Sequence, residues 1–98
     1  MSRKIIYHVA IQKEIREILD YYENISIQLA DDFWEELTDG FDAARRYPSR
    51  QHYDSSGRRR VNLTRFPYHF LFKVSKTQIK VTVVKHNSRH PGYGSRRN

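Results

Sequence analysis

The spacing of apolar residues changes once along this chain, and the change restricts the folds that it can adopt. Apolar side chains recur every three or four residues from 11 to 22 and again from 30 to 44, which is the spacing of an amphipathic helix. In residues 58–64, 68–74 and 78–86 apolar and polar residues alternate instead, as is typical of strands. The sequence therefore predicts two helices followed by three strands.

The residues between these runs predict how the elements connect. Asn24 or Ser26 can cap the second helix and Pro48 ends it, so a short link should join the helices as an antiparallel hairpin. RKIIYHV, residues 3–9, is predicted to be a further strand, whereas PSRQHYDSSG, residues 48–57, is predicted to be an irregular, mobile connection. We expect an α+β fold, strand-helix-helix-strand-strand-strand, with the hairpin covering one face of an antiparallel sheet.

The length of 98 residues suits a single domain. We divide it into a strand and helical hairpin (1–48), the antiparallel strands (58–86) and a basic tail (87–98). The chain contains no cysteine, which excludes disulfides and thiolate metal sites. Since no apolar run has the length of a signal sequence or a membrane span, we expect a cytoplasmic protein without a membrane partner.

Charge is distributed unevenly between the two halves of the chain. Residues 1–48 contain ten acidic and six basic side chains, whereas residues 49–98 contain twelve bases and one acid, Asp54. The two halves thus carry −4 and +11 of the total charge of +7. This asymmetry indicates that the second half faces an anionic partner, either nucleic acid or an acidic protein segment. The alternative is that the charge serves solubility alone, for which scattered lysines would suffice.

Strand alternation assigns side chains to the two faces of the predicted sheet. The face toward the helices is predicted to contain Val61, Leu63, Tyr68, Phe70, Phe72, Ile79, Val81 and Val83. The opposite face is predicted to contain Arg60, Asn62, Thr64, His69, Lys73, Lys80, Thr82 and His86. Lys85 does not fit the alternation, so the last strand should end or twist there, or the lysine should extend past the edge of the core. The face away from the helices is thus basic and polar.

The motifs exclude several kinds of site. His86 and His90 are four residues apart, but the intervening NSR and the following Pro91 disfavour the helix that would make both metal ligands. The glycine motifs of nucleotide-binding proteins and the nucleophile motif of hydrolases are absent. Paired carboxylates are also disfavoured, because ten of the eleven acids lie in the first half. We expect no metal and no cofactor.

The basic and aromatic residues of the second half suit cleavage of RNA by its own 2′-hydroxyl. This reaction needs a proton acceptor, groups that stabilise charge on phosphorus, and a donor to the leaving oxygen. Arg60, Arg65 and Arg89 suit the charge, and His86 or Tyr93 would transfer protons or stack on a base. These five are the candidate catalytic residues. The candidate contacts to nucleic acid or another target are Arg58, Arg59, Lys73, Lys80 and Lys85.

Each of these residues also has a structural interpretation. Residues 58–60 would be a solvated arginine run, His86 a hydrogen-bonded histidine at a strand end, and Tyr93 a packing residue that anchors the tail. For any one residue alone the structural interpretation is the more common one. Only the presence of all these residues together favours the functional interpretation over the structural one.

Three segments resemble the RelE/ParE superfamily of bacterial type II toxins, often called plasmid stabilisation proteins. They are AIQKEIREILDYYENISIQLADDFWEEL, RRVNLTRFPYHFLFKV and IKVTVVKHNSRHPGY. The resemblance covers nearly the whole chain, and it implies the element order given above and a growth-arresting toxin that an antitoxin wraps and neutralises. RelE-like members cut messenger RNA in the ribosomal A site, whereas ParE-like members poison DNA gyrase and cleave nothing.

The resemblance also implies roles for single residues. Arg60 is similar to the arginine of the second sheet strand, Arg65 or Lys73 to the basic residue near the third strand, Arg89 to the arginine after the last strand, and Tyr93 to the C-terminal tyrosine. The lysine-rich helix of RelE-like nucleases is absent, and the acidic hairpin is more similar to ParE. The tail nevertheless supplies His, Arg and Tyr together, so the sequence leaves both modes of toxicity open.

Two kinds of partner follow from the resemblance: a cognate antitoxin, and a target that is either the ribosome with messenger RNA or DNA gyrase. A basic sheet face with a strand edge favours an added strand or an acidic amphipathic helix. We expect the antitoxin to cover Arg60, Lys73 and Arg89 in a toxin–antitoxin hetero-oligomer. The alternative is a non-toxic nucleic-acid-binding or adaptor module held by phosphate contacts.

Overall fold

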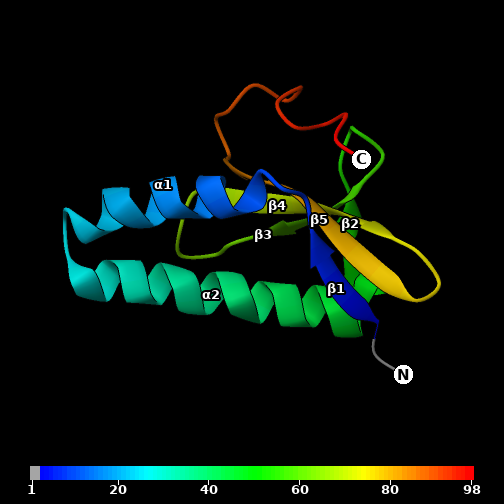
Figure 1. Cartoon of the computed structure of the whole chain (residues 1–98), viewed down its shortest axis with the longest axis horizontal. Helices are drawn as coiled ribbons and strands as arrows, with labels where there is room; N and C mark the ends of the chain where they lie inside the picture. Colours follow the sequence, from blue (N-terminus) through cyan, green and yellow to red (C-terminus); the bar gives the residue numbers. More distant parts are fainter. Residues whose placement is uncertain (1–2) are drawn as a thin grey trace.

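The computed structural model of this protein describes residues 3–98, in which two helices pack against a five-stranded sheet (Figure 1). In chain order the elements are β1 (Lys4–Tyr7), α1 (Ile11–Glu23), α2 (Ile27–Arg46), the 3-10 turn η1 (Pro48–Arg50), β2 (His52–Tyr53), β3 (Arg59–Asn62), β4 (Tyr68–Val74) and β5 (Gln78–His86). The predicted α+β class and the order of its elements are confirmed. Neither α1 nor α2 has the length and apolar character needed to cross a lipid bilayer, and no other helix in residues 3–98 does.

The strands form one mixed sheet in the order β1-β5-β4-β3-β2. Strands β2 to β5 pair antiparallel with their neighbours, but β1 pairs with β5 in parallel, so the sheet is not wholly antiparallel as predicted. Alternation predicts which face of the sheet a residue occupies, but not whether two strands distant in sequence pair parallel or antiparallel. Parallel pairing requires a long connection, which the two helices contribute between β1 and β5. The segment 48–57, predicted to be irregular, contains η1 and β2.

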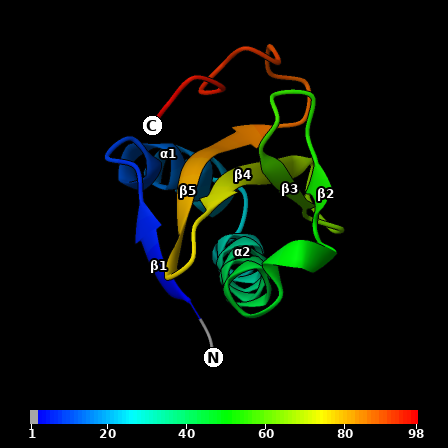
Figure 2. The same cartoon turned by 90° about the vertical axis from the view of Figure 1, so that its right-hand side faces the viewer.

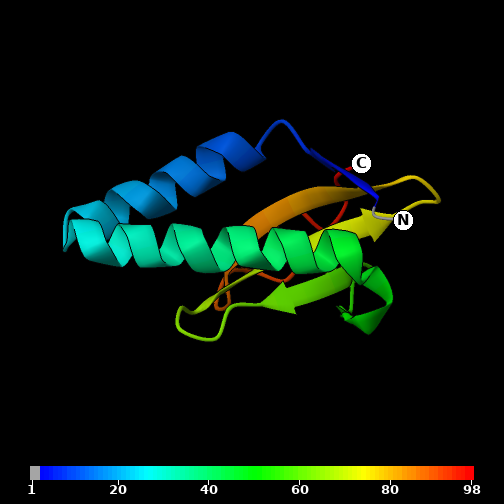
Figure 3. The same ribbon diagram turned by 90° about the horizontal axis from the view of Figure 1, so that it is seen from below.

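Helix α2 begins and ends where the capping residues predict. Ser26 is the N-cap of α2, and its side-chain oxygen accepts the N–H of Leu29 at 3.3 Å. Pro48 follows α2 and begins η1. Helix α2 lies beneath one face of the sheet, while the tail lies above the other (Figure 2). Seen from below, α1 and α2 diverge from their linking turn toward β1 (Figure 3).

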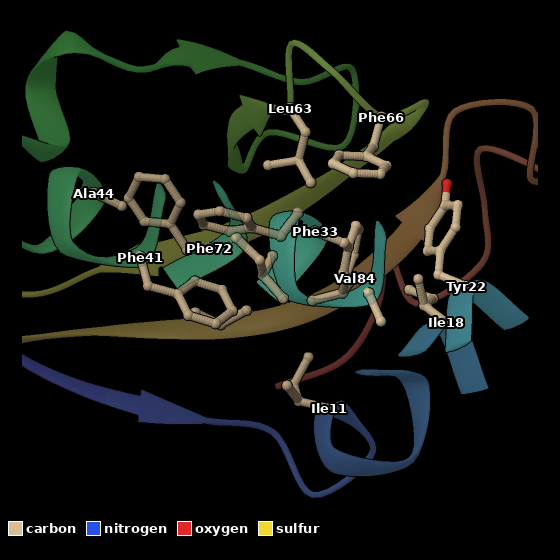
Figure 4. Close-up of a cluster of buried hydrophobic side chains, with 14 of the residues drawn as sticks. Ile11, Ile18, Tyr22, Phe33, Phe41, Ala44, Leu63, Phe66, Phe72 and Val84 are labelled. Carbon is tan, nitrogen blue, oxygen red and sulfur yellow. The ribbon is translucent and has the colours of Figure 1, made fainter. Parts of the chain in front are cut away.

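The hydrophobic core fills the space between the helices and the sheet (Figure 4). Phe33 and Phe41 of α2 share this core with Phe70 and Phe72 of β4, and both β4 side chains are fully buried. The rings of Phe41 and Phe70 pack edge to face with 4.8 Å between centroids. Such aromatic pairs contribute about 0.5–1.5 kcal/mol beyond their burial, so this core fixes α2 on the sheet.

A β-bulge in β5 interrupts the predicted alternation. Leu71 of β4 lies opposite Val83, but the next residue, Phe72, lies opposite Val81. Thr82 is therefore the extra residue, and it is fully buried with its hydroxyl donating to the carbonyl of Leu71 at 3.3 Å. One extra residue moves every later side chain of the strand to the opposite face.

The faces predicted for Thr82, Val83 and His86 were wrong because of this bulge. Val84 rather than Val83 packs in the helix-facing core, and His86 lies opposite Tyr68 on the helix side instead of facing away. Lys85, which did not fit the alternation, pairs with His69 on the other side of the sheet. The run VTVV has apolar residues on both faces, so alternation could not locate the extra residue.

Candidate functional site

Four candidate residues, Arg60, Lys73, Lys80 and Lys85, lie on the face of the sheet that is turned away from α2, which we call the open face. Cross-strand register places on it His52, Arg60, Asn62, His69, Leu71, Lys73, Lys80, Val83 and Lys85. The tail folds over the β5 side of this face (Figure 2). Part of the open face is thus covered, whereas the region around Lys73 reaches solvent.

Lys85 holds the tail in place. Its side chain is 5% exposed, and its amino group donates to the carbonyls of Pro91 at 3.0 Å and Tyr93 at 2.9 Å. Burial lowers the pKa of Lys85, and the neighbouring Arg60 acts in the same direction. Sequence reasoning offered Lys85 as a contact to the target, but its ammonium already bonds to the protein's own backbone. Lys85 therefore anchors the tail, and it is not among the residues that we propose as contacts to a partner.

A buried ion pair closes the edge of β5 beyond the end of β1. Glu14 of α1 accepts the N–H of Val84 at 3.1 Å, and its other carboxylate oxygen accepts from Arg97 at 2.7 Å. Arg97 also donates to the carbonyl of Thr82 at 3.1 Å. An unpaired strand edge would otherwise leave these backbone groups without partners. The network joins α1, β5 and the tail.

The candidate catalytic residues Arg89 and Tyr93 meet within the tail. The guanidinium carbon of Arg89 lies 3.8 Å from the centre of the Tyr93 ring, and that of Arg97 lies 5.0 Å away. The next residue, Gly94, has a φ of +72° and lies against Val83. Arg89 itself is exposed, so its charge is available although the ring beneath it is partly buried.

Arg60 is the most firmly oriented arginine of the open face. Its Nε donates to Asn62 Oδ1 at 2.7 Å, and its Nη1 donates to Asp54 at 3.1 Å. Burial acts to raise the pKa of Asp54, but hydrogen bonds from Ser56 and Arg60 outweigh it and hold the pKa below its usual value. Asp54, the one acid of residues 49–98, thus fixes the direction of Arg60.

Positive charges without acidic partners lie at the other end of the open face. Lys73 and Lys80 are directly opposite each other across β4 and β5, and neither forms an ion pair with another residue of 3–98. Like charges at opposed positions destabilise a sheet. Nη1 of Arg58 is also buried without an acceptor in the described chain, and burial lowers the pKa of Arg58. These groups are suited to an anionic partner.

Two candidate catalytic residues lie away from the open face. Arg65, in the β3–β4 turn, donates to Asp32 of α2 at 3.0 Å. His86 lies against Tyr68 with 5.0 Å between ring centroids, and its Nδ1 accepts the N–H of Ser88 at 3.0 Å. Arg60, Arg89 and Tyr93 therefore belong to the open face and its tail, but Arg65 and His86 do not.

Sequence reasoning did not single out His69, although alternation placed it on the open face. Its imidazole is 3% exposed, Nδ1 bonds to Asn87 Oδ1 at 2.8 Å, and Nε2 has no partner in the described residues. Burial lowers the pKa of His69, and the positive charges of Arg60 and Lys85 also lower it. The hydrogen bond to Asn87 acts in the opposite direction. Burial and the neighbouring cations thus favour the neutral form of this imidazole.

His69 should make stability depend on pH below its ordinary pKa of 6.5. The imidazole of His69 binds a proton less readily in the folded chain than in the unfolded chain. The neutral imidazole therefore contributes fully to the free energy of unfolding above about pH 6.5, and this contribution is lost as the pH falls toward the lowered pKa of the folded chain. We expect the melting temperature to fall as the pH decreases below about 6.5, and to fall less in His69→Gln. His52→Gln, at an exposed histidine, is the control. An equal fall in both variants would contradict this role.

An apolar groove lies between the diverging helices, on the side away from the open face. Its lining includes Ile15 and Leu19 of α1, Trp34 and Phe41 of α2, and Val9 before α1. Trp34 is 47% exposed and Val9 is 91% exposed. The groove was not foreseen, although Trp34 on an apolar helical stripe was the available signal.

In the part of the chain that the structure describes, no three His, Cys, Asp or Glu side chains are grouped so as to hold a metal ion. No protein-family model and no curated protein matches the sequence. Among solved structures, the chain is similar to one from "Chromosomal ParDE TA system from P. aeruginosa", with a TM-score of 0.74 and 15% identity over 87% of this chain and 96% of that chain. Its helical hairpin and five-stranded sheet therefore form a ParE-like fold.

Proposed function

We propose that this chain is the toxin of a type II toxin–antitoxin system and arrests growth until an antitoxin neutralises it. The observation that carries the proposal is the fold similarity to a chain of a ParDE system over nearly the full length of both. The unpaired basic groups of the open face support it, since a toxin needs a surface for an anionic target or partner. DNA gyrase and the ribosome are cytoplasmic, so we propose that the chain acts in the cytoplasm.

Poisoning of DNA gyrase is the mode that the geometry supports better. Cleavage of RNA without a metal needs proton-transfer and charge-stabilising groups around one phosphate. Arg65 is bonded to α2 and His86 faces the helix side, whereas Arg60 lies on the open face. A toxin that acts by binding does not need these groups to converge.

Cleavage of messenger RNA is the second candidate, and the orientation of Arg60 favours it. Asp54 and Asn62 hold its guanidinium, and a preorganised cation is what stabilises a phosphorane-like transition state. His52 is the cross-strand neighbour of Arg60, is exposed, and would be the proton acceptor.

For the antitoxin we propose an acidic segment that covers Arg60, Lys73 and Arg89, forming a hetero-oligomer. Charge complementarity would accelerate the encounter, and apolar contacts would hold the complex. Replacing the three residues with glutamine is expected to weaken antitoxin binding and to reduce its dependence on salt. Unchanged affinity would contradict this placement.

The mode is tested with the purified chain in two assays. In the first, gyrase and supercoiled plasmid are incubated with the chain, and trapped double-strand breaks are expected only when gyrase is present. In the second, translating ribosomes are incubated with the chain and the message is mapped by primer extension. Codon-positioned cuts that disappear in Arg60→Gln would instead establish cleavage, and a chain inactive in both assays would contradict the toxin proposal.

A further inference from the structure

Two exposed tyrosines beyond the C-terminal end of α2 each carry an arginine stacked on the ring. The guanidinium carbon of Arg50 lies 4.1 Å from the centre of the Tyr47 ring, and that of Arg59 lies 4.3 Å from the centre of the Tyr53 ring. Tyr47 is 46% exposed and Tyr53 is 67% exposed, so both rings retain accessible surface. We call these four residues the arginine–tyrosine patch.

One short connection holds both halves of the patch. The carbonyl of Tyr47 accepts the N–H of Arg50 at 3.1 Å as η1 begins. Arg59 pairs with Tyr53 across β2 and β3, and its Nη1 donates to the carbonyl of Gln51 at 2.8 Å. Gln51 directly follows Arg50, so one short segment from η1 to β2 connects the two pairs at the β2 edge of the sheet, beside the end of α2 (Figure 2).

The hydrophobic core does not account for these rings. Tyr22, which does belong to the core, is 7% exposed, whereas neither Tyr47 nor Tyr53 is part of the core cluster. An arginine stacked on an exposed ring restricts its motion, so less conformational entropy is lost when a flat ligand stacks on the remaining surface. The rings are thus prepared for a partner with planar groups.

Positive charge beside the rings is not neutralised within the described chain. Arg50, Arg58 and Arg59 form no ion pair with any residue of 3–98, whereas both arginines in the last turn of α2 are paired with Asp42. The partner that fits is therefore anionic as well as planar.

We propose that the arginine–tyrosine patch binds single-stranded nucleic acid, with bases stacked on Tyr47 and Tyr53 and phosphates bound by Arg50 and Arg59. A single strand combines unpaired bases, which stack on aromatic side chains, with a backbone of negatively charged phosphates. The patch combines exposed aromatic rings with arginines, so it matches both features. A duplex hides its bases within its own stack, and an acidic peptide carries charge without bases. This site goes beyond the proposed toxicity, and a chain that arrests no growth would still bind the strand.

The test measures the affinity of the full chain for a short labelled RNA of mixed sequence at low salt. The same sequence as single-stranded DNA and as a duplex completes the set, with poly-glutamate as a competitor. Tyr53→Leu is expected to weaken single-strand binding by about 5- to 100-fold, because it removes a stacking surface, whereas Tyr53→Phe keeps the ring and the affinity. Tyr21→Leu, at a tyrosine of α1 that is 59% exposed, is the matched control and should bind normally.

Two further readouts separate stacking from simple charge attraction. A 2-aminopurine base in the strand should lose fluorescence on binding the wild type and Tyr53→Phe, but not Tyr53→Leu. Arg50→Gln should reduce the slope of log K against log salt by about 0.7, the value for one phosphate contact on a single strand. Thermal unfolding of each variant establishes that it is folded. If the leucine variant unfolds, the 2-aminopurine signal of the wild type decides the question, because binding without loss of fluorescence would contradict stacking.

Several outcomes would overturn the proposal. They are equal binding of duplex and single strand, full displacement by poly-glutamate, wild-type affinity in Tyr53→Leu, and absence of binding at low salt. Equal affinity for RNA and DNA would support it, because stacking does not involve the 2′-hydroxyl. A preference for RNA would also support it and would identify RNA as the ligand.

Discussion

Replacing Glu14 with alanine is expected to lower the free energy of unfolding by about 3–5 kcal/mol, because it leaves a mostly buried arginine without its counter-charge. Glu14 is 8% exposed and bonds both Arg97 and the N–H of Val84. Its loss would open the edge of β5 and release the tail together. Urea denaturation followed by circular dichroism measures the change.

The control for this prediction is Glu17→Ala on the same helix. Glu17 is exposed and lies 3.9 Å from Lys13, and exposed pairs of this kind contribute about 0.3–0.5 kcal/mol. Alanine at both Glu14 and Arg97 should be less damaging than the sum of the two single changes, because the unpaired charge is then absent. A loss in Glu14→Ala no larger than in the control would contradict the account of the tail.

Gly94→Ala is expected to lower the free energy of unfolding by about 2–4 kcal/mol, for two reasons that add. The backbone of Gly94 has a φ of +72°, which a residue with a Cβ adopts at a cost, and a Cβ there would lie 2.7 Å from Cγ2 of Val83. Tail and sheet would have to separate. The same urea denaturation measures the effect.

Gly57→Ala isolates the conformational part of this cost. Gly57 has a φ of +87° but no heavy atom within 4 Å of an added Cβ, so about 1 kcal/mol is expected from the backbone alone. The difference between the two variants measures the contact between the tail and Val83. Equal losses would mean that the tail is not packed on β5.

Apolar spacing predicted the elements of this fold because each periodicity reports on one element at a time. It placed both helices and the strands β3, β4 and β5, and the capping signals at Ser26 and Pro48 located the ends of α2. It could not indicate that β1 would lie parallel to β5, since pairing between distant segments leaves no local signal. Apolar spacing could not locate the bulge at Thr82 either, because the run VTVV places apolar residues on both faces of the strand.

The candidate site was less predictable because it depends on tertiary contacts. Alternation placed Arg60 and Lys73 on the open face, but it did not show that Lys85 would be enclosed by tail carbonyls. One signal was available: Glu14 lies three residues after Ile11, on the buried stripe of α1. An acid on an apolar stripe requires a buried partner, although its spacing does not identify Arg97 as that partner.

The measurement that tests the central claim most directly is the viable count of bacteria after induction of this chain without an antitoxin. The account predicts that the wild-type chain reduces the count and that glutamine at Arg60, Lys73 and Arg89 restores it at equal levels of folded protein. Glutamine at Lys13 and Arg16, two exposed cations of α1, should leave toxicity intact. Unimpaired growth with abundant folded wild-type chain would contradict the toxin function and favour a binding module.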